Sequence, residues 1–314
     1  MTLAPFVRIV AQGKGRARAL TQDEACEAMG IILSGTAAPE AIGALLMVLR
    51  LRGETDAEIA GFTAALRANS VVNLPQADLD WPCYAAGRSR GAPLFALAAK
   101  LVTQAGYTVA MHGWNSHQDG SADLRTALND TGLIGGGLQY YPLEDLSPVA
   151  LDVLKLRDTF NLRSCINTVL RMWNPTHAKA MVQGVFHPSY RGLQSRAAAL
   201  LGDETLTVIK GGGGEFERNP GKDIAVFGLK NGVELDETAL TLIDESRRLH
   251  EPDRAVGLGE LWSGQADDPF AVDTVIGTAS LALWTLGAQD SIAKAETMAR
   301  GLWAGRNAHK RETE

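Results

Sequence analysis

Residues 81–116 constrain the fold more than any other stretch of this chain. They read WPCYAAGRSRGAPLFALAAKLVTQAGYTVAMHGWNS, which predicts a short apolar strand, a loop, a helix, a second strand at 107–111 and a turn at His112 and Gly113. A strand, a helix and a strand in this order normally build a parallel sheet. Ligands of parallel α/β sheets bind beyond the carboxyl ends of the strands. We therefore expect residues 85–92 and 112–120 to face a binding site.

The first of these loops carries arginine where phosphate-cradling loops carry glycine and hydroxyl groups. Such cradles present several backbone N–H groups at a helix N-terminus. This loop has only two glycines, and Pro93 at the start of the helix supplies no N–H. Arg88 and Arg90 instead offer side-chain charge, which suits a protein that follows the backbone of a nucleic acid. A solvated arginine turn without a ligand is the alternative at this point.

Length and composition indicate a globular protein of one large or two moderate domains. The chain has 314 residues, of which 46% are hydrophobic, so it can form a substantial core. No window of 18 apolar residues predicts a membrane helix, and the basic residues near the N-terminus follow the apolar ones, which is the wrong order for a signal peptide. The three cysteines form no CxxC pair and the histidines show no ligand spacing. We expect a cytoplasmic protein without a transition metal.

Charge is segregated along the chain, although its total is −6. Residues 81–118 carry +3 and residues 153–179 carry +4, so the remainder carries −13. The basic residues of these stretches are Arg88, Arg90 and Lys100, and then Lys155, Arg157, Arg163, Arg171 and Lys179. The acidic total argues against a nucleic-acid partner, whereas the distribution favours one. Solvated helix faces would produce the same pattern.

The N-terminal residues predict a compact all-helical unit. Thr21 with Glu24, and Thr55 with Glu58, have the spacing of capping boxes, and Pro39 suits the first turn of a helix between them. Apolar residues such as Leu46, Met47 and Leu51 exceed what this unit needs for its own core. They suit a dimer contact or packing against the rest of the chain.

The residues that follow alternate between helix and strand. We expect helices at 123–131, 147–172, 194–201, 270–286 and 291–305, strands at 138–141, 180–186 and 206–209, and a hairpin that turns at 230–232. A run of four glycines in residues 210–218, KGGGGEFER, predicts backbone that can approach a ligand closely. A disordered surface loop is the alternative for this run.

The match to one family extends over nearly the whole chain. It includes LTQDEACEAMGIILSGTAAPEAIGALLMVLRLRGETDAEIAGFTAAL, GYTVAMHG, GSAD, LRSCINTVLRMWNP and LALWTLGAQDSIAKAETMARGLWAG. These segments resemble the anthranilate phosphoribosyltransferases of glycosyltransferase family 3, which also contains pyrimidine nucleoside phosphorylases. The resemblance implies a small helical domain, residues 1–70 with a returning segment at about 158–174, beside a large α/β domain at 71–314 with a mostly parallel sheet. It also implies a homodimer formed through the N-terminal helices.

The motifs that carry the family's chemistry differ in this chain. The family's Gly-Thr-Gly-Gly-Asp diphosphate turn aligns with residues 83–87, CYAAG, and its Lys-His-Gly-Asn-Arg aligns with residues 111–115, MHGWN. The Asp-Glu pair that holds magnesium in the family aligns with Glu215 and Phe216, so Glu217 would have to supply the second carboxylate. Arg163 matches the arginine that contacts the anthranilate carboxylate, and Asn167 matches the asparagine of the same motif.

The chain therefore resembles a divergent branch of the family that binds nucleic acid without transferase activity. We expect a binder of single-stranded DNA or RNA that needs no cofactor, with Trp114 or Phe216 as a base-stacking face or as core residues. The residues expected to bind phosphate are Arg88, Arg90, Lys155, Arg157, Arg163, Arg171, Lys210 and Arg218.

The alternative is an active phosphoribosyl- or glycosyltransferase on an aromatic acid or base. In that case His112, Gly113, Asn115, Arg163 and Asn167 would bind substrate, and Glu215 and Glu217 would hold Mg²⁺. A phosphorolytic nucleoside enzyme is a third interpretation, and it lacks the lysine and serine expected for phosphate.

Overall fold

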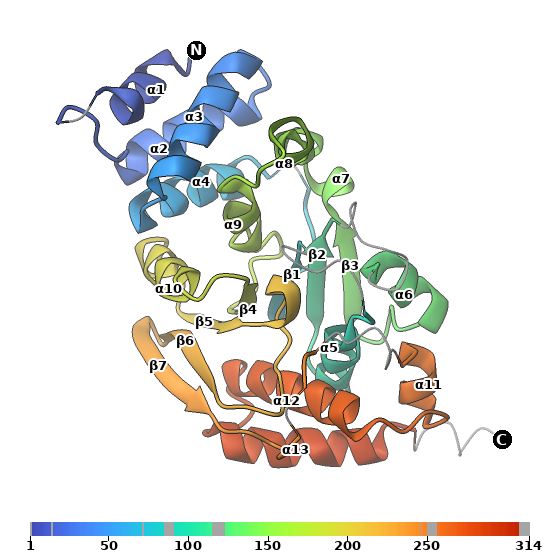
Figure 1. The fold of residues 1–314 in the computed structure, drawn as a ribbon. Coiled ribbons are helices and arrows are strands. Elements are labelled where there is room, and N and C mark those ends of the chain that lie inside the picture. The colour runs from blue at the N-terminus through green and yellow to red at the C-terminus, as the bar shows by residue number, and fades with distance from the viewer. Residues whose placement is uncertain are drawn as a thin grey trace.

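The fold combines a small bundle of helices with a larger α/β part (Figure 1). The computed structural model describes residues 2–13, 15–70, 72–84, 91–114, 123–245, 247–249 and 256–307. Within these residues no helix is both long and apolar enough to cross a membrane.

The helical bundle begins and ends its elements where the sequence signals predict. It consists of α1 (Ala4–Ala11), α2 (Gln22–Leu33), α3 (Pro39–Arg52) and α4 (Asp56–Ala68). Both expected capping boxes form, so the first N–H groups of α2 and α4 are satisfied by side chains. The apolar surplus is mostly internal, because Leu46 is buried, whereas Leu51 is 91% exposed.

One sheet of seven strands forms the centre of the larger part. Its order is β3-β2-β1-β4-β5-β6-β7, and the first five strands in this order are parallel. The strands are β1 (Leu79–Cys83), β2 (Val109–Gly113), β3 (Leu138–Pro142), β4 (Ala180–Val185), β5 (Thr205–Lys210), β6 (Ile224–Lys230) and β7 (Val233–Ala239). Later strands are added on one side of β1 as far as β3 and on its other side from β4 onward, so the topological switch point, where the strand order reverses, lies between β1 and β4. The carboxyl ends of these two strands are therefore the expected place for a ligand.

The antiparallel hairpin of β6 and β7 confirms the turn predicted from the sequence. Lys230 pairs with Val233, and the two residues between them, Asn231 and Gly232, both have positive φ angles of 54° and 75°. A two-residue turn with this geometry matches the twist of the strands that it joins.

Helices cover both faces of the sheet. They are α5 (Leu94–Gln104), α6 (Leu124–Thr131), α7 (Leu143–Leu146), α8 (Pro148–Phe160), α9 (Ile166–Arg171), α10 (Tyr190–Leu200), α11 (Leu258–Ser263), α12 (Pro269–Thr285) and α13 (Ile292–Gly305), with a short 3₁₀ turn, η1, at Gly212–Gly214. Strand β4 shows the alternation, because Met181 and Val185 join the core beneath α9 and α10 while Val182 joins the core beneath α5 and α12.

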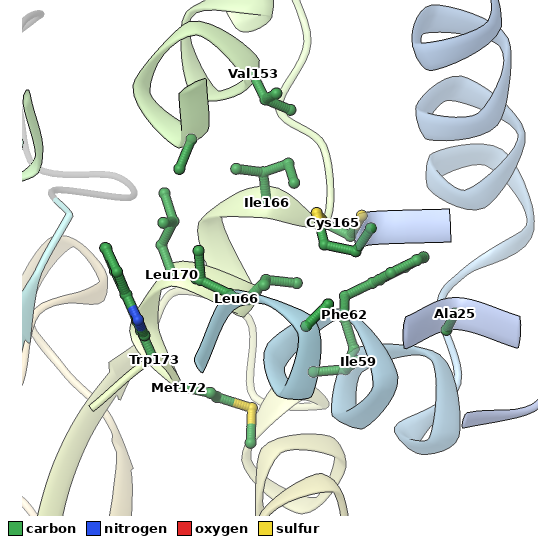
Figure 2. Close-up of a cluster of buried hydrophobic side chains, with 14 of the residues drawn as sticks. Ala25, Ile59, Phe62, Leu66, Val153, Cys165, Ile166, Leu170, Met172 and Trp173 are labelled. Atoms are coloured by element: carbon green, nitrogen blue, oxygen red, sulfur yellow. The ribbon is translucent and has the colours of Figure 1, made fainter. Parts of the chain in front are cut away.

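The helical bundle shares one hydrophobic core with α8, α9 and α10. Figure 2 shows Phe62 and Leu66 of α4 beside Cys165, Ile166 and Leu170 of the α9 segment. Arg67 adds hydrogen bonds to the carbonyl groups of Met172 and Trp173. The residues near 158–174 therefore pack with the N-terminal helices, and the domain boundaries at 70 and 71 stay a prediction.

Candidate functional site

A pocket of about 270 Å³ lies at the carboxyl end of β4, on the side of the sheet that faces the helical bundle. We call it the arginine pocket. Its arginine and amide side chains are Arg50, Asn161, Arg163, Asn167, Arg171 and Gln194, and it is completed by Leu162, Ser164, Thr168, Val185, Phe186, His187 and Tyr190. The pocket thus lies beside the reversal point of the sheet, where parallel α/β folds bind their ligands.

Short-range helix geometry brings the polar side chains of α9 together. Asn167 and Arg171 are four residues apart, so they lie on the same face of α9. Arg171 Nη1 donates a hydrogen bond to the backbone oxygen of Asn167 at 3.2 Å. Gln194 reaches the pocket from α10. Its position is buried, as are those of Ala197 and Ala198 on the same helix, so an apolar residue would be expected there.

Several arginines of this region are close enough to affect one another. The pKa of Arg163 is lowered, first by burial and then by the like charges of Arg157, Arg171 and Arg50. Burial also lowers the pKa of Arg171, and the charge of Glu215 opposes this effect. Neither Arg163 nor Arg171 forms an ion pair with a carboxylate in the part of the chain that the structure describes. The pocket therefore presents positive charge that forms no ion pair within the described residues.

The floor of the arginine pocket contains polar atoms that lack hydrogen bonds. Arg171 is 4% exposed, and its Nε and Nη2 atoms have no partner among the described residues. The same holds for the Nδ2 atom of Asn167 and for both polar side-chain atoms of Gln194. Buried polar groups without partners cost free energy, so such a group of donors in one pocket indicates a ligand that accepts hydrogen bonds.

The two candidate magnesium ligands, Glu215 and Glu217, are buried and interact with different parts of the chain. Glu217 Oε2 accepts a hydrogen bond of 3.0 Å from the backbone N–H of Phe95, at the first turn of α5. Glu215 acts on the charge of Arg171. Within the described ranges no three or more His, Cys, Asp or Glu side chains are grouped so as to hold a metal ion. Glu217 would have to turn away from α5 before it could hold a metal ion.

The run of glycines before these carboxylates is required by close packing of the backbone. A Cβ atom on Gly211 would lie 1.8 Å from the backbone oxygen of Glu215, and one on Gly184 of β4 would lie 2.0 Å from the Glu215 carbonyl carbon. Gly213 adopts a left-handed conformation with φ 62°. The glycines therefore let the loop fold onto itself and onto β4.

Arg218, expected to bind phosphate, lies in the core. Its Nη1 atom pairs with Glu296 Oε1 at 2.8 Å and also contacts Ser280 Oγ, while Nη2 donates to the backbone oxygen of Leu240. Gly277 on α12 leaves room for it, because a Cβ there would lie 3.1 Å from Arg218 Cδ. These contacts give Arg218 a structural position away from the arginine pocket.

Lys210, also expected to bind phosphate, is exposed at the end of β5 and lines a second pocket of about 410 Å³. We call this the glycine-loop pocket. Its charged residues are Arg191, Lys210, Lys222, Asp223 and Arg248. Arg191 is held over the ring of Phe227, 4.7 Å from its centroid, and donates to the backbone oxygen of Ala225.

The two pockets are neighbours. Val185 of the arginine pocket pairs with Lys210 of the glycine-loop pocket across β4 and β5, and Tyr190 and Arg191 are consecutive in α10. Adjacent strands lie about 4.8 Å apart. The carboxyl edge of the sheet thus carries two basic pockets side by side.

His112 and Gly113, candidate substrate residues, are part of the packing between β1 and β2. The His112 ring is fully buried, with Nδ1 2.8 Å from the Tyr84 hydroxyl and Nε2 3.2 Å from Asp80. Burial is the main reason why the pKa of Tyr84 is raised. A Cβ on Gly113 would lie 1.8 Å from the Cys83 oxygen. These contacts hold the two strands together.

The remaining expected residues divide into three groups. Arg88, Arg90 and Asn115 lie outside the described residues. Lys155 is exposed on α8, and Arg157 of the same helix lies near Arg163. Both proposed stacking rings are buried, and Phe216 packs edge-on against Trp81 with ring centroids 5.3 Å apart.

Four residues of the arginine pocket were not expected from the sequence to belong to a site: Arg50, His187, Tyr190 and Gln194. Arg50 lies outside the two basic stretches, and only the fold brings it near Arg163. Gln194 did carry a signal, because a buried amide on the apolar side of a helix suggests a polar neighbour.

Comparison with known proteins gives a consistent result. Residues 6–70 match a family model described as the helical bundle domain of a glycosyl transferase family. The anthranilate phosphoribosyltransferase of Roseiflexus castenholzii is 32% identical over 264 residues, which cover 78% of this chain and 72% of that protein. The enzyme of the same name from Geobacillus kaustophilus is 29% identical over 317 residues, which cover 93% and 92%.

Solved structures share the fold. The anthranilate phosphoribosyltransferase of Thermus thermophilus superposes with a TM-score of 0.75 at 24% identity and covers 93% of each chain. That of Saccharomyces cerevisiae in complex with PRPP and Mg has a TM-score of 0.72 at 15% identity, and covers 98% of this chain and 95% of its own. The sequence relatives and the shared fold together show that this chain belongs to the glycosyltransferase family of the anthranilate phosphoribosyltransferases.

Proposed function

We propose that this chain is a nucleic-acid-binding member of its family, which holds the backbone of single-stranded DNA or RNA along the carboxyl edge of the sheet. The observation that supports it most is the arginine pocket, where Arg163 and Arg171 lie together without a carboxylate partner in the described chain. The glycine-loop pocket continues the positive charge at the neighbouring strand. Two adjacent basic pockets suit successive phosphates of one strand.

The binding surface would include basic side chains around these pockets, and those that the structure describes are exposed or half-buried except the buried Arg171. They are Arg50, Lys155, Arg157, Arg163, Arg171 and Lys210, joined by Arg88 and Arg90 from outside the described residues. Arg218 has its own carboxylate and is not part of this surface. We expect no cofactor, because phosphate contacts of this kind need none.

Fluorescence anisotropy with a labelled single-stranded oligonucleotide tests this proposal. We expect an affinity that falls steeply as salt rises, because bound phosphates release their counterions. The double variant R50A/R163A should weaken binding and flatten the salt slope by roughly 2, while K294A, on α13 and paired with Asp290, should behave like the wild type. Absent or salt-independent binding would contradict the proposal.

The second candidate is an active Mg²⁺-dependent phosphoribosyl- or glycosyltransferase that acts on an aromatic acid or base. The relatives favour it, because proteins of 29–33% identity are named anthranilate phosphoribosyltransferases. The arginine pocket also has the size for one small aromatic acid, with Arg163 placed to bind its carboxylate. This candidate requires Glu217 to leave the first turn of α5 if it is to bind a metal.

One thermal-shift series separates the two candidates. A ligand that binds only the folded state raises the melting temperature. Stabilisation by PRPP with Mg²⁺, followed by turnover with anthranilate, would establish the transferase. Stabilisation by an oligonucleotide, without any effect of PRPP and Mg²⁺, would support nucleic-acid binding.

We also propose a homodimer formed through the N-terminal helices. Leu51 at the end of α3 is 91% exposed, which leaves a large apolar side chain for a second copy to cover. Light scattering of the wild type and of L51D measures this directly. A wild-type monomer would exclude it.

A further inference from the structure

The arginine pocket has a floor and a rim of different character. Its floor is formed by the buried side chains of Asn167, Arg171, Val185 and Gln194. Its rim carries two exposed apolar side chains, Leu162 at 51% and Phe186 at 45%. A ligand that satisfies both must therefore place an anionic end at the floor and an apolar body at the rim.

The chemistry of the floor favours a dianion. Two arginines lie there or directly above it, and the unpartnered atoms include the Nε and Nη2 atoms of Arg171 and the amide nitrogens of Asn167 and Gln194. Glu54 accepts a hydrogen bond from the Tyr190 hydroxyl and Glu215 acts on the charge of Arg171, but neither carboxylate lines the pocket. A phosphomonoester carries about −1.5 to −2 charges at pH 7 and three acceptor oxygens. A phosphodiester or a carboxylate carries only one charge.

Size limits which part of a strand can enter. The volume of about 270 Å³ lies at or below the range of about 300–1,000 Å³ that is usual for small-molecule sites. A phosphodiester inside a strand must leave room for the chain on both sides, which a floor of buried side chains does not provide. A terminal phosphate has a single ester bond and can reach the floor with its three free oxygens.

The rim offers a surface for the first base of such a strand. Phe186 follows β4 directly, and the His187 ring packs edge-on against it with centroids 4.9 Å apart. This contact holds the Phe186 ring while leaving nearly half of the residue exposed. Stacking of a base on an aromatic ring contributes about 1–3 kcal/mol in proteins that bind single strands. Free inorganic phosphate could not use this contact.

We propose that the arginine pocket is an end-binding site, which takes the terminal phosphomonoester of a single-stranded oligonucleotide at Arg171 and Arg163 and stacks its first base on Phe186. This inference rests on the proposed nucleic-acid function and refines it. Backbone contacts along the carboxyl edge would hold any strand, and the pocket would add a preference for strands with a phosphorylated end.

The test compares oligonucleotides of one sequence that differ only at their ends. A 12-residue strand carries a 5′-phosphate, a 3′-phosphate or hydroxyl groups at both ends, and a covalently closed circle supplies a strand without ends. Each is used at equal salt to compete for the protein against a labelled strand. We expect one phosphorylated strand to bind at least 10-fold more tightly than the hydroxyl strand and the circle, and inorganic phosphate to compete only weakly.

Variants connect this preference to the pocket. R171M removes the charge but keeps an unbranched apolar stem in its place, so it should fold and bring phosphorylated and hydroxyl strands within about twofold of each other. F186A should reduce the preference by a smaller factor, and K294A should retain it. Circular dichroism and thermal melting confirm that each variant folds.

The possible outcomes separate this inference from the proposed function. Equal binding of all four strands by the wild type would overturn the end-binding site and leave backbone binding intact. A preference that survives in R171M would place the end site elsewhere and also overturn the inference. Failure of every strand to bind would remove the proposed function and the inference together.

Discussion

Two regions of this molecule bury an arginine, and they treat it in opposite ways. Beside α12 and α13, Arg218 has a carboxylate, a hydroxyl and a carbonyl group as partners. At the carboxyl end of β4, Arg171 has one hydrogen bond within the described residues, to a carbonyl of its own helix. Burial lowers the pKa of both guanidinium groups, and a charge within ion-pair distance opposes this only for Arg218.

The difference teaches that burial alone does not identify a functional arginine. A buried charge that is paired with a carboxylate contributes to the fold, and removal of one partner leaves the other uncompensated. A buried charge without an ion pair, on a side chain that lines a pocket, suits a ligand. The expected consequences of substitution are therefore opposite in the two regions.

The largest effect is expected for R218A. It removes a fully buried side chain and leaves the half-buried Glu296 carboxylate unpaired, so we expect the free energy of unfolding to fall by about 3–5 kcal/mol. Urea denaturation followed by circular dichroism measures this. R196A, which breaks the more exposed pair with Asp56, serves as the control and should cost less than about 1 kcal/mol. If R218A were as stable as R196A, the structural assignment of Arg218 would be wrong.

A smaller effect, on binding rather than stability, is expected for R171M. R171M removes a charge that acts on the buried Glu215 but breaks no ion pair within the described residues, so we expect the free energy of unfolding to fall by less than in R218A. Affinity for a phosphorylated oligonucleotide should fall about 10-fold, which corresponds to about 1.4 kcal/mol. Denaturation and anisotropy on the same sample provide both values. A destabilisation as large as that of R218A would erase the contrast between the two regions.

An exposed basic residue at the edge of the site should show a weaker effect. K210A removes one charge from the glycine-loop pocket. Within the described residues, no carboxylate forms an ion pair with Lys210. We expect affinity to fall about threefold at low salt and the salt slope to decrease by about 1. Anisotropy at several salt concentrations measures both. An unchanged slope would show that bound strands do not reach this pocket.

The smallest effect is expected for an arginine pair at the surface, which extends the comparison beyond the core. Arg18 bonds to Glu24 at 2.6 Å and, with the capping box of Thr21, lowers the pKa of Glu24 to about 2. Because this folded pKa lies below the unfolded one, Glu24 stabilises the protein above about pH 5 and loses its contribution as pH falls toward 2.

Solvent screening limits this contribution to below about 1 kcal/mol. E24Q should therefore lower stability slightly at pH 7 and not at pH 2, as measured by urea denaturation at both values. Equal effects at the two pH values would assign the loss to the helix cap rather than to charge.

Local signals in the sequence predicted most of the fold. The capping boxes, the crossover unit and the turn at Asn231 and Gly232 depend on residues a few positions apart, and all three form. The family resemblance supplied the arrangement of the helical bundle beside a parallel sheet, which the structure and the relatives confirm.

The site was predictable only in part, because its partners are distant in the chain. Arg218 pairs with Glu296, 78 positions away, and Glu217 bonds to Phe95 across 122 positions. No local pattern distinguishes Arg218 from Arg171, although one belongs to the core and the other to a pocket. The sequence did indicate the basic stretch that contains Arg163 and Arg171, and it could not indicate that Arg50 and Gln194 complete the pocket.

The bond between Glu217 and the first turn of α5 has a consequence for ligand competition. The first turn of a helix attracts anions, and here the chain supplies its own. A tethered group acts at an effective concentration that reaches the millimolar range or above even for flexible links. Any phosphate that approaches this turn competes with the Glu217 carboxylate, whose local concentration does not depend on the concentration of the protein. Glu217 thus occupies this turn, and a phosphate can bind there only by displacing its carboxylate.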